Sequence, residues 1–207
     1  MFFPFALLFF LVITCVTGLR SDYVTSISPH ANTGWGSWGR ADWCPFGHYA
    51  YGFQLKVEGN QGGGDDTAVN GIRLHCRSAC HKFGGDITSS VMVWGNWENS
   101  KYCSWNNFLM GVSMKSEPHQ GRRGDDTAVN NFQFLCQSIY RHHAIHTLTG
   151  HGMPWGHWSS PVHCPKNSYI CGIKTQVEGF QGRRGDDTAL NDAIFYCCRL
   201  KRKTCRG

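Results

Sequence analysis

Carboxylate side chains recur at three matched places in this chain of 207 residues. Each of three glutamates is followed, seven or eight residues later, by a pair of aspartates. The glutamates and the first aspartate of each pair are Glu58, Glu117, Glu178, Asp65, Asp125 and Asp186. Glycosyl transfer generally uses two carboxyl groups, one a proton donor and the other a nucleophile or base, on either side of the glycosidic bond. These six residues are therefore the candidates for a catalytic role.

Six tryptophans form a second recurring group, because the pattern Trp-Gly-x-Trp also occurs three times. They are Trp35, Trp38, Trp94, Trp97, Trp155 and Trp158. A large aromatic ring with a polar N–H suits a surface that is apolar on one side and wet on the other, so these rings are candidates for stacking on sugars. The alternative is that they wedge the sheet edges into the core, which three identical positions also favour.

Both groups belong to a unit that is written three times. In each unit the tryptophan pair is followed by a cysteine, a glycine, the glutamate, the phrase Gly-Asp-Asp-Thr-Ala and a closing cysteine, and successive units are 59 to 61 residues apart. Such a regular spacing is the signature of a repeat architecture. We predict units at about residues 24–80, 81–140 and 141–198, within a single domain that spans residues 19–207.

The elements of each unit are expected to be strands. Residues 52–58 and 72–76 alternate apolar and polar side chains, and the later units repeat the alternation. A period of two indicates a strand with one buried face, and no stretch shows a convincing helical period. A unit of about four short strands cannot bury its faces alone. The sequence therefore predicts an all-β fold, a β-prism of three antiparallel sheets with pseudo-threefold symmetry.

The acidic pairs lie in the phrases QGGGDDTAVN, QGRRGDDTAVN and QGRRGDDTALN. Their glycines permit the positive φ angles of a tight connection. The side-chain oxygens of Asp-Asp-Thr can bond to nearby backbone N–H groups. We interpret the phrase as a structural corner between two inner strands, in which Thr67, Thr127 and Thr188 share the role.

The N-terminal segment predicts export. Residues 1–18 form an apolar run that is too short to span a bilayer comfortably and ends in small residues, so we expect a cleaved signal peptide. Cys15 leaves with it, and ten cysteines remain for an oxidising compartment: Cys44, Cys76, Cys80, Cys103, Cys136, Cys164, Cys171, Cys197, Cys198 and Cys205.

Matched positions within the units predict three of the disulfides. The pairs are Cys44–Cys76, Cys103–Cys136 and Cys164–Cys197. Each would close a loop of about 32 residues, worth on the order of 3–4 kcal/mol. The other four cysteines allow three pairings, which the sequence leaves open.

The charge of the chain bears on its partners. The net charge is +6, and part of it lies in a basic C-terminal tail at residues 199–207. Such a tail is either a solvated terminus or an attraction for acidic glycans. We expect extracellular glycans or mucin-like glycoproteins as partners, and neither nucleic acid, membrane insertion, a cofactor nor a metal. The oligomeric state stays open.

The three units, with Trp-Gly-x-Trp, a cysteine, Val-Glu-Gly and the Gly-Asp-Asp-Thr-Ala phrase, resemble the vitelline membrane outer layer protein 1 family from about Val24 to Cys198. The resemblance implies a β-prism of three Greek-key sheets, disulfides and secretion. Members of that family lie in the outer layer of the avian egg vitelline membrane, and a transferase activity on chito-oligosaccharides has been ascribed to them. This chain departs at Gly62-Gly63-Gly64, where the other units have Gly-Arg-Arg-Gly, and at Ser116-Glu117-Pro118, where they have Val-Glu-Gly.

Two functions therefore compete. The first is a secreted structural or glycan-associated component of an extracellular coat. The alternative is a glycosyl-transferring enzyme that acts on N-acetylglucosamine oligomers. Catalysis needs two carboxyl groups in different environments, whereas a threefold repeat places equivalent carboxyl groups in equivalent ones. We therefore expect the coat protein rather than the enzyme.

Overall fold

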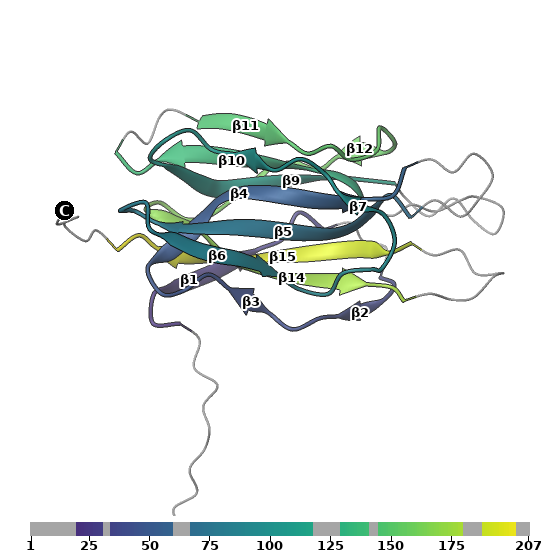
Figure 1. Ribbon diagram of the computed structural model, residues 1–207, viewed down its shortest axis with the longest axis horizontal. Coiled ribbons are helices and arrows are strands. Elements are labelled where there is room, and N and C mark those ends of the chain that lie inside the picture. The colour runs from purple at the N-terminus through teal and green to yellow at the C-terminus, as the bar shows by residue number, and fades with distance from the viewer. Residues whose placement is uncertain are drawn as a thin grey trace, which may run out of the picture.

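The computed structural model describes residues 20–30, 34–59, 67–117, 129–140, 145–179 and 188–201. Over these ranges it contains strands and turns, and no helix long and apolar enough to cross a membrane. The strands form three antiparallel five-stranded sheets (Figure 1), which confirms the predicted all-β prism.

Each sheet has two long strands, a third strand beside them and two short strands at the other edge. Sheet A contains β1 (Tyr23–Ile27), β15 (Leu190–Arg199), β14 (Ser168–Val177), β2 (Ser37–Trp38) and β3 (Asp42–Trp43). Sheet B contains β6 (Phe83–Thr88), β5 (Val69–Ser78), β4 (His48–Val57), β7 (Asn96–Trp97) and β8 (Lys101–Tyr102). Sheet C contains β11 (Ile145–Thr149), β10 (Val129–Ser138), β9 (Asn107–Ser116), β12 (His157–Trp158) and β13 (Val162–His163).

The sheets are Greek keys, because the short strands return along the chain to lie beside the first strand. Sheet B runs β4, β5 and β6 and then places β7 and β8 against β4. In sheet A the returning strands come from the start of the chain, so the N-terminal β1, β2 and β3 complete a sheet begun by β14 and β15. The sheets therefore do not coincide with the sequence units, since each takes strands from two of them.

The long strands carry the predicted alternation into the core. Phe53, Leu55 and Val57 are buried, whereas Gln54 and Lys56 between them are half-buried. The inner strands β4, β9 and β14 contact one another around the pseudo-threefold axis. The aromatic core crosses all three sheets: the ring centroid of Phe134 lies 4.6 Å from that of Phe53 and 5.2 Å from that of Phe195. Each sheet is thus covered by the other two.

A second buried layer closes one end of the prism. Tyr49, Phe108 and Tyr169 stand at equivalent places on β4, β9 and β14, and their ring centroids lie 5.7 to 6.2 Å apart in edge-to-face pairs. The Tyr49 hydroxyl donates a hydrogen bond to the Arg199 carbonyl and accepts one from the Lys201 backbone N–H. Burial raises the pKa of Tyr49, so the phenol stays neutral in this layer.

Four disulfides join described cysteines. Cys44–Cys76, Cys103–Cys136 and Cys164–Cys197 confirm the predicted pairs. The fourth joins Cys171 to Cys198 within sheet A, which decides among the pairings that the sequence left open. Cys80 is also disulfide-bonded, and Cys205 lies outside the described residues.

Candidate functional site

Two of the three repeated glutamates, Glu58 and Glu178, accept a hydrogen bond in a corner between two long strands. In sheet B the Thr67 hydroxyl donates to Glu58 Oε2 at 2.6 Å, and Asn70 Nδ2 donates to Thr67 Oγ1 at 2.7 Å. The backbone N–H of Glu58 bonds to the carbonyl of Ala68, whose φ of 49° lies in the left-handed region. Thr67 and Asn70 are buried, so this chain of bonds satisfies the Thr67 hydroxyl and Asn70 Nδ2, which water does not reach, while Asn70 Oδ1 has no partner among the described residues.

Sheet A repeats the same corner. Thr188 donates to Glu178 Oε2 at 2.6 Å, Asn191 donates to Thr188 at 2.7 Å, and Ala189 has a φ of 50°. Glu58 and Glu178 thus each accept a hydrogen bond from the equivalent threonine at the same distance, so the corner has the same geometry in both sheets.

Of the remaining catalytic candidates, Glu117 lies within the described residues. Glu117 directly follows β9 as its counterparts follow β4 and β14, and Thr127 lies outside the described residues. Asp65, Asp125 and Asp186 also lie outside them, so their candidacy stays a prediction.

The glycine of Trp-Gly-x-Trp explains why the pattern recurs. Gly36, Gly95 and Gly156 have φ angles of 70° to 79°, which favour glycine. A Cβ at Gly95 would overlap the backbone of Val57 and Glu58, and the other two glycines meet the ends of β14 and β9 in the same way. Each glycine therefore lets a short strand pair closely with the long inner strand of its own sheet.

The second tryptophan of each pair lies on β2, β7 or β12, and Figure 1 shows these strands at the same end of the prism. Trp38 and Trp158 are 38% and 37% exposed, and Trp97 is half-buried. Each ring faces a cation: Lys174 Nζ lies 5.4 Å from the ring centroid of Trp38, and corresponding cations accompany the other two. Of the first tryptophans, Trp94 is 41% exposed, and Trp35 and Trp155 are half-buried.

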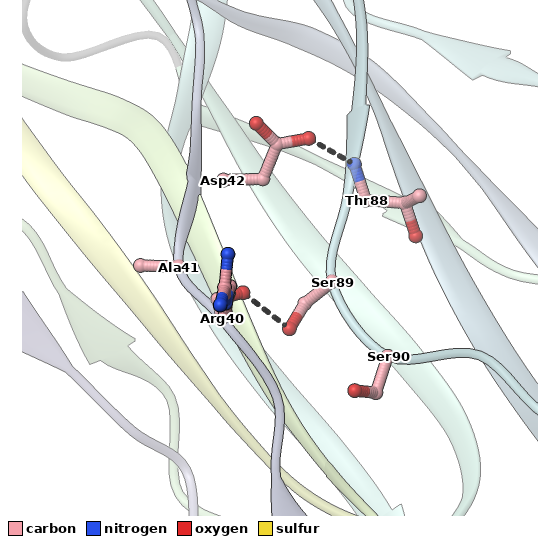
Figure 2. A pocket seen from close by; sticks show the side chains of 6 residues that line it. All are labelled: Arg40, Ala41, Asp42, Thr88, Ser89 and Ser90. Atoms are coloured by element: carbon pink, nitrogen blue, oxygen red, sulfur yellow. Dashed lines mark hydrogen bonds between the residues drawn. The ribbon is translucent and has the colours of Figure 1, made fainter.

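A polar hollow lies where sheet A meets sheet B, between the segment that leads into β3 and the end of β6 (Figure 2). Its lining residues are Arg40, Ala41, Asp42, Thr88, Ser89 and Ser90. Its volume of about 420 Å³ falls in the range of small-molecule sites. No local sequence pattern indicates this hollow, because its two walls come from different sequence units.

Two of the lining side chains, Asp42 and Ser89, form hydrogen bonds within the protein. Asp42 accepts hydrogen bonds from the backbone N–H groups of Trp43 at 2.9 Å and Thr88 at 3.0 Å. The Ser89 hydroxyl donates to the Arg40 carbonyl at 2.8 Å (Figure 2). It also accepts a hydrogen bond from the Thr175 N–H at 3.0 Å.

Among the residues that line the hollow, Arg40 carries the positive charge that could bind an anionic ligand. Its side chain is exposed, and its guanidinium has neither an ion pair nor a hydrogen bond within the described ranges. The equivalent residues of the other two units are Asn99 and Ser160, so one of the three equivalent positions carries a positive charge. That departure from the repeat is the signal by which the sequence could have revealed the site.

The comparisons with known proteins agree with this architecture. A human protein, vitelline membrane outer layer protein 1 homolog, is 40% identical over 198 residues, which are 90% of this chain and 89% of the relative. Among solved structures, Calystegia sepium agglutinin covers 86% of this chain and 97% of its own with a TM-score of 0.51 at 11% identity. Calsepa lectin, solved in complex with a biantennary N-glycan, covers 88% and 99% with a TM-score of 0.50 at 14% identity.

The sequence identity to the two lectins, 11% and 14%, is so low that the similarity shows a shared fold and nothing more. The family comparison goes further, because its model matches residues 25–200, which include all three units, the four described disulfides and both described corners. The chain belongs to the family of vitelline membrane outer layer protein I.

Proposed function

We propose that this protein is a secreted, glycan-associated component of an extracellular coat, and that it binds acidic glycans beside the hollow between sheets A and B. The observation that carries the proposal is the closeness of an exposed ring to an unpaired cation. Trp38 and Arg40 are two residues apart, so their Cα atoms lie within about 7 Å of each other.

The chemistry of the two side chains suits an acidic sugar. The Trp38 ring offers an apolar face, while the Arg40 guanidinium presents several donors to a carboxylate or sulfate. Lys174 beside Trp38 adds a second positive charge, and the net charge of the chain is +6. Because an exposed cation attracts an anion mainly through long-range charge, this part of the affinity should weaken as salt is added.

Two further findings support the extracellular glycan class. Disulfides persist in oxidising compartments, and this chain has four among its described cysteines. The prism is shared with Calsepa lectin, which was crystallised with an N-glycan. The corners at Glu58 and Glu178 supply no comparable support for a transferase, because each carboxylate accepts the same hydrogen bond from a threonine.

Calorimetric titration of the purified secreted protein tests the proposal. The ligands are a sialylated or sulfated oligosaccharide and a neutral N-acetylglucosamine oligomer of similar length. We expect the acidic ligand to bind more tightly, and Arg40→Ala to weaken it about tenfold, or 1.4 kcal/mol, while it changes the neutral ligand little. Trp38→Ala should weaken both.

The repeat offers matched controls. Ser160→Ala and Trp158→Ala alter the places in the third unit that correspond to Arg40 and Trp38, and both should leave the affinity unchanged. Equal affinity of the native protein and Arg40→Ala for the acidic ligand would refute the site. Binding of neither ligand would refute the function, and mass spectrometry that finds longer and shorter oligomers would favour the transferase instead.

A further inference from the structure

Three polar side chains on the outer face of sheet B form a continuous relay. His75 Nδ1 lies 2.7 Å from Asp86 Oδ1, and His75 Nε2 lies 3.0 Å from Ser100 Oγ. His75 belongs to β5, Asp86 is its register partner on β6, and Ser100 directly precedes β8. Three segments far apart in the sequence therefore supply a serine, a histidine and an aspartate within hydrogen-bond reach of one another.

The roles of the two ring nitrogens follow from their partners. An ionised carboxylate only accepts hydrogen bonds, so Nδ1 must carry the proton that is shared with Asp86. In the neutral ring Nε2 is then an acceptor, and the Ser100 hydroxyl donates to it. This is the arrangement in which an imidazole acts as a general base toward a serine hydroxyl, with the carboxylate holding the tautomer.

The surroundings fix the ring and leave the nucleophile reachable. The side chain of His75 is 7% exposed, and its ring centroid lies 5.1 Å from that of Tyr102. Ser100 is half-buried, and Tyr102, two residues further on in β8, is 49% exposed. The base is thus positioned by packing, and the hydroxyl lies at a surface that a small molecule can approach.

The relay belongs to one sheet. The residue that pairs with the glycine of the inner strand is His75 in sheet B, Leu135 in sheet C and Tyr196 in sheet A. The in-unit disulfides, by contrast, recur in all three units, and the corner is described in two of the sheets. The relay is instead an addition to one face.

We propose that Ser100, His75 and Asp86 form a nucleophilic site for small carboxylic esters, independent of the glycan site. In the first step Ser100 Oγ attacks the carbonyl carbon, its proton passes to His75 Nε2, and the C–O bond to the alcohol breaks. The alcohol leaves with the proton from Nε2, so that an acyl-serine remains. Water attacks the acyl-serine with the same proton transfer, which releases the acid and restores Ser100.

Labelling with a fluorophosphonate tests the first step. The probe forms a covalent bond to an activated serine and releases fluoride. We expect peptide mapping by mass spectrometry to find the adduct on Ser100 of the intact secreted protein and not on Ser160, which is exposed and has no histidine partner among the described residues. p-Nitrophenyl acetate then measures turnover.

Two variants separate a relay from a structural bond. Ser100→Ala removes one hydroxyl and should abolish labelling while the melting temperature changes little. Asp86→Asn keeps the size of the side chain but no longer enforces the tautomer, so labelling should slow at least tenfold. The control Ser160→Ala should label like the native protein.

The proposal is overturned if the native protein gains no adduct on Ser100, or if a folded Asp86→Asn labels as fast as the native protein. Should Asp86→Asn fail to fold, the native protein and Ser100→Ala still decide the question, because only an activated serine labels faster than Ser160.

Discussion

The outer faces of sheets A and B share a backbone and differ in chemistry. In sheet A, Cys171 and Cys198 form a disulfide, and the equivalent places in sheet B hold Tyr51 and Arg77, whose guanidinium lies 4.3 Å from the Tyr51 ring centroid. Next to them, sheet A stacks Tyr196 on Trp43 with ring centroids 4.3 Å apart. Sheet B places His75 there.

The comparison shows which positions keep the same type of side chain in each unit and which positions differ. Toward the axis, equivalent positions carry apolar side chains of similar role, because a close-packed core tolerates little change of volume. On the outer faces the same backbone carries a covalent, aromatic surface in one sheet and an ionisable one in another. Chemistry in this fold should therefore be sought where one sheet departs from the other two.

The largest effect is expected where the two sheets are alike. Gly36→Ala, against sheet A, and Gly95→Ala, against sheet B, would each place a Cβ inside the backbone of the neighbouring strand at a positive φ. We expect each to lower the unfolding free energy by about 3 kcal/mol or more, from left-handed strain and overlap together. Denaturant titration measures this.

Gly34 is the matched control, because its φ is 74° but no atom lies within 4 Å of its Cβ position. Gly34→Ala should cost only the strain, about 1–2 kcal/mol. If the two substitutions on the sheets differ widely from each other, the equivalence of these two junctions is wrong.

The next largest loss of stability is expected on the outer face of sheet A, which has a disulfide that the described outer face of sheet B does not share. The double substitution Cys171→Ala with Cys198→Ala opens a disulfide with a sequence separation of 27, and we expect a loss of roughly 3 kcal/mol. Calorimetric unfolding of the variant against the native protein measures the loss. A loss below about 1 kcal/mol would mean that packing of the face, and not the cross-link, carries its stability.

The corresponding change in sheet B should be far smaller. Arg77 is buried and its Nε has no hydrogen-bond partner, and burial lowers the pKa of its guanidinium. Arg77→Met loses the cation–π contacts, about 1–2 kcal/mol, and the long hydrogen bonds from Nη2 to the Ser104 and Asn107 carbonyls, and the relief of desolvation offsets these losses. We expect the unfolding free energy to change by less than about 1 kcal/mol. A large loss in urea titration would show that the cation stabilises its face as strongly as the disulfide does.

The smallest effect concerns alkaline pH. Burial raises the pKa of Tyr51 in sheet B and of Tyr196 in sheet A, so the folded protein favours the neutral phenol. This contribution is complete below the ordinary tyrosine pKa of about 10 and is lost as the pH rises through the raised values. The unfolding free energy should therefore decline above pH 10, and Tyr51→Phe or Tyr196→Phe should make the decline shallower. An unchanged pH profile in both variants would contradict the effect of burial.

Much of the fold was predictable, because its determinants are local or periodic. Alternation in the first unit predicted that Phe53, Leu55 and Val57 face the core, and spacing predicted three of the disulfides. The site was less accessible. No pattern in the sequence marks Arg40 and Asp42 as site residues, because the wall that completes their hollow, Thr88 to Ser90, lies in the next unit.

The sequence by itself determined that three units of short strands repeat and that each closes one disulfide. Only the tertiary structure decided which strands share a sheet, because a short strand can pair with any free edge and the choice depends on where the chain returns. The same pairing of strands brought Ser100 within hydrogen-bond distance of His75, which also contacts Asp86. It also formed the hollow between residues 40–42 and residues 88–90. Such contacts between distant segments leave no periodic trace in the sequence, since each needs only one residue from each strand.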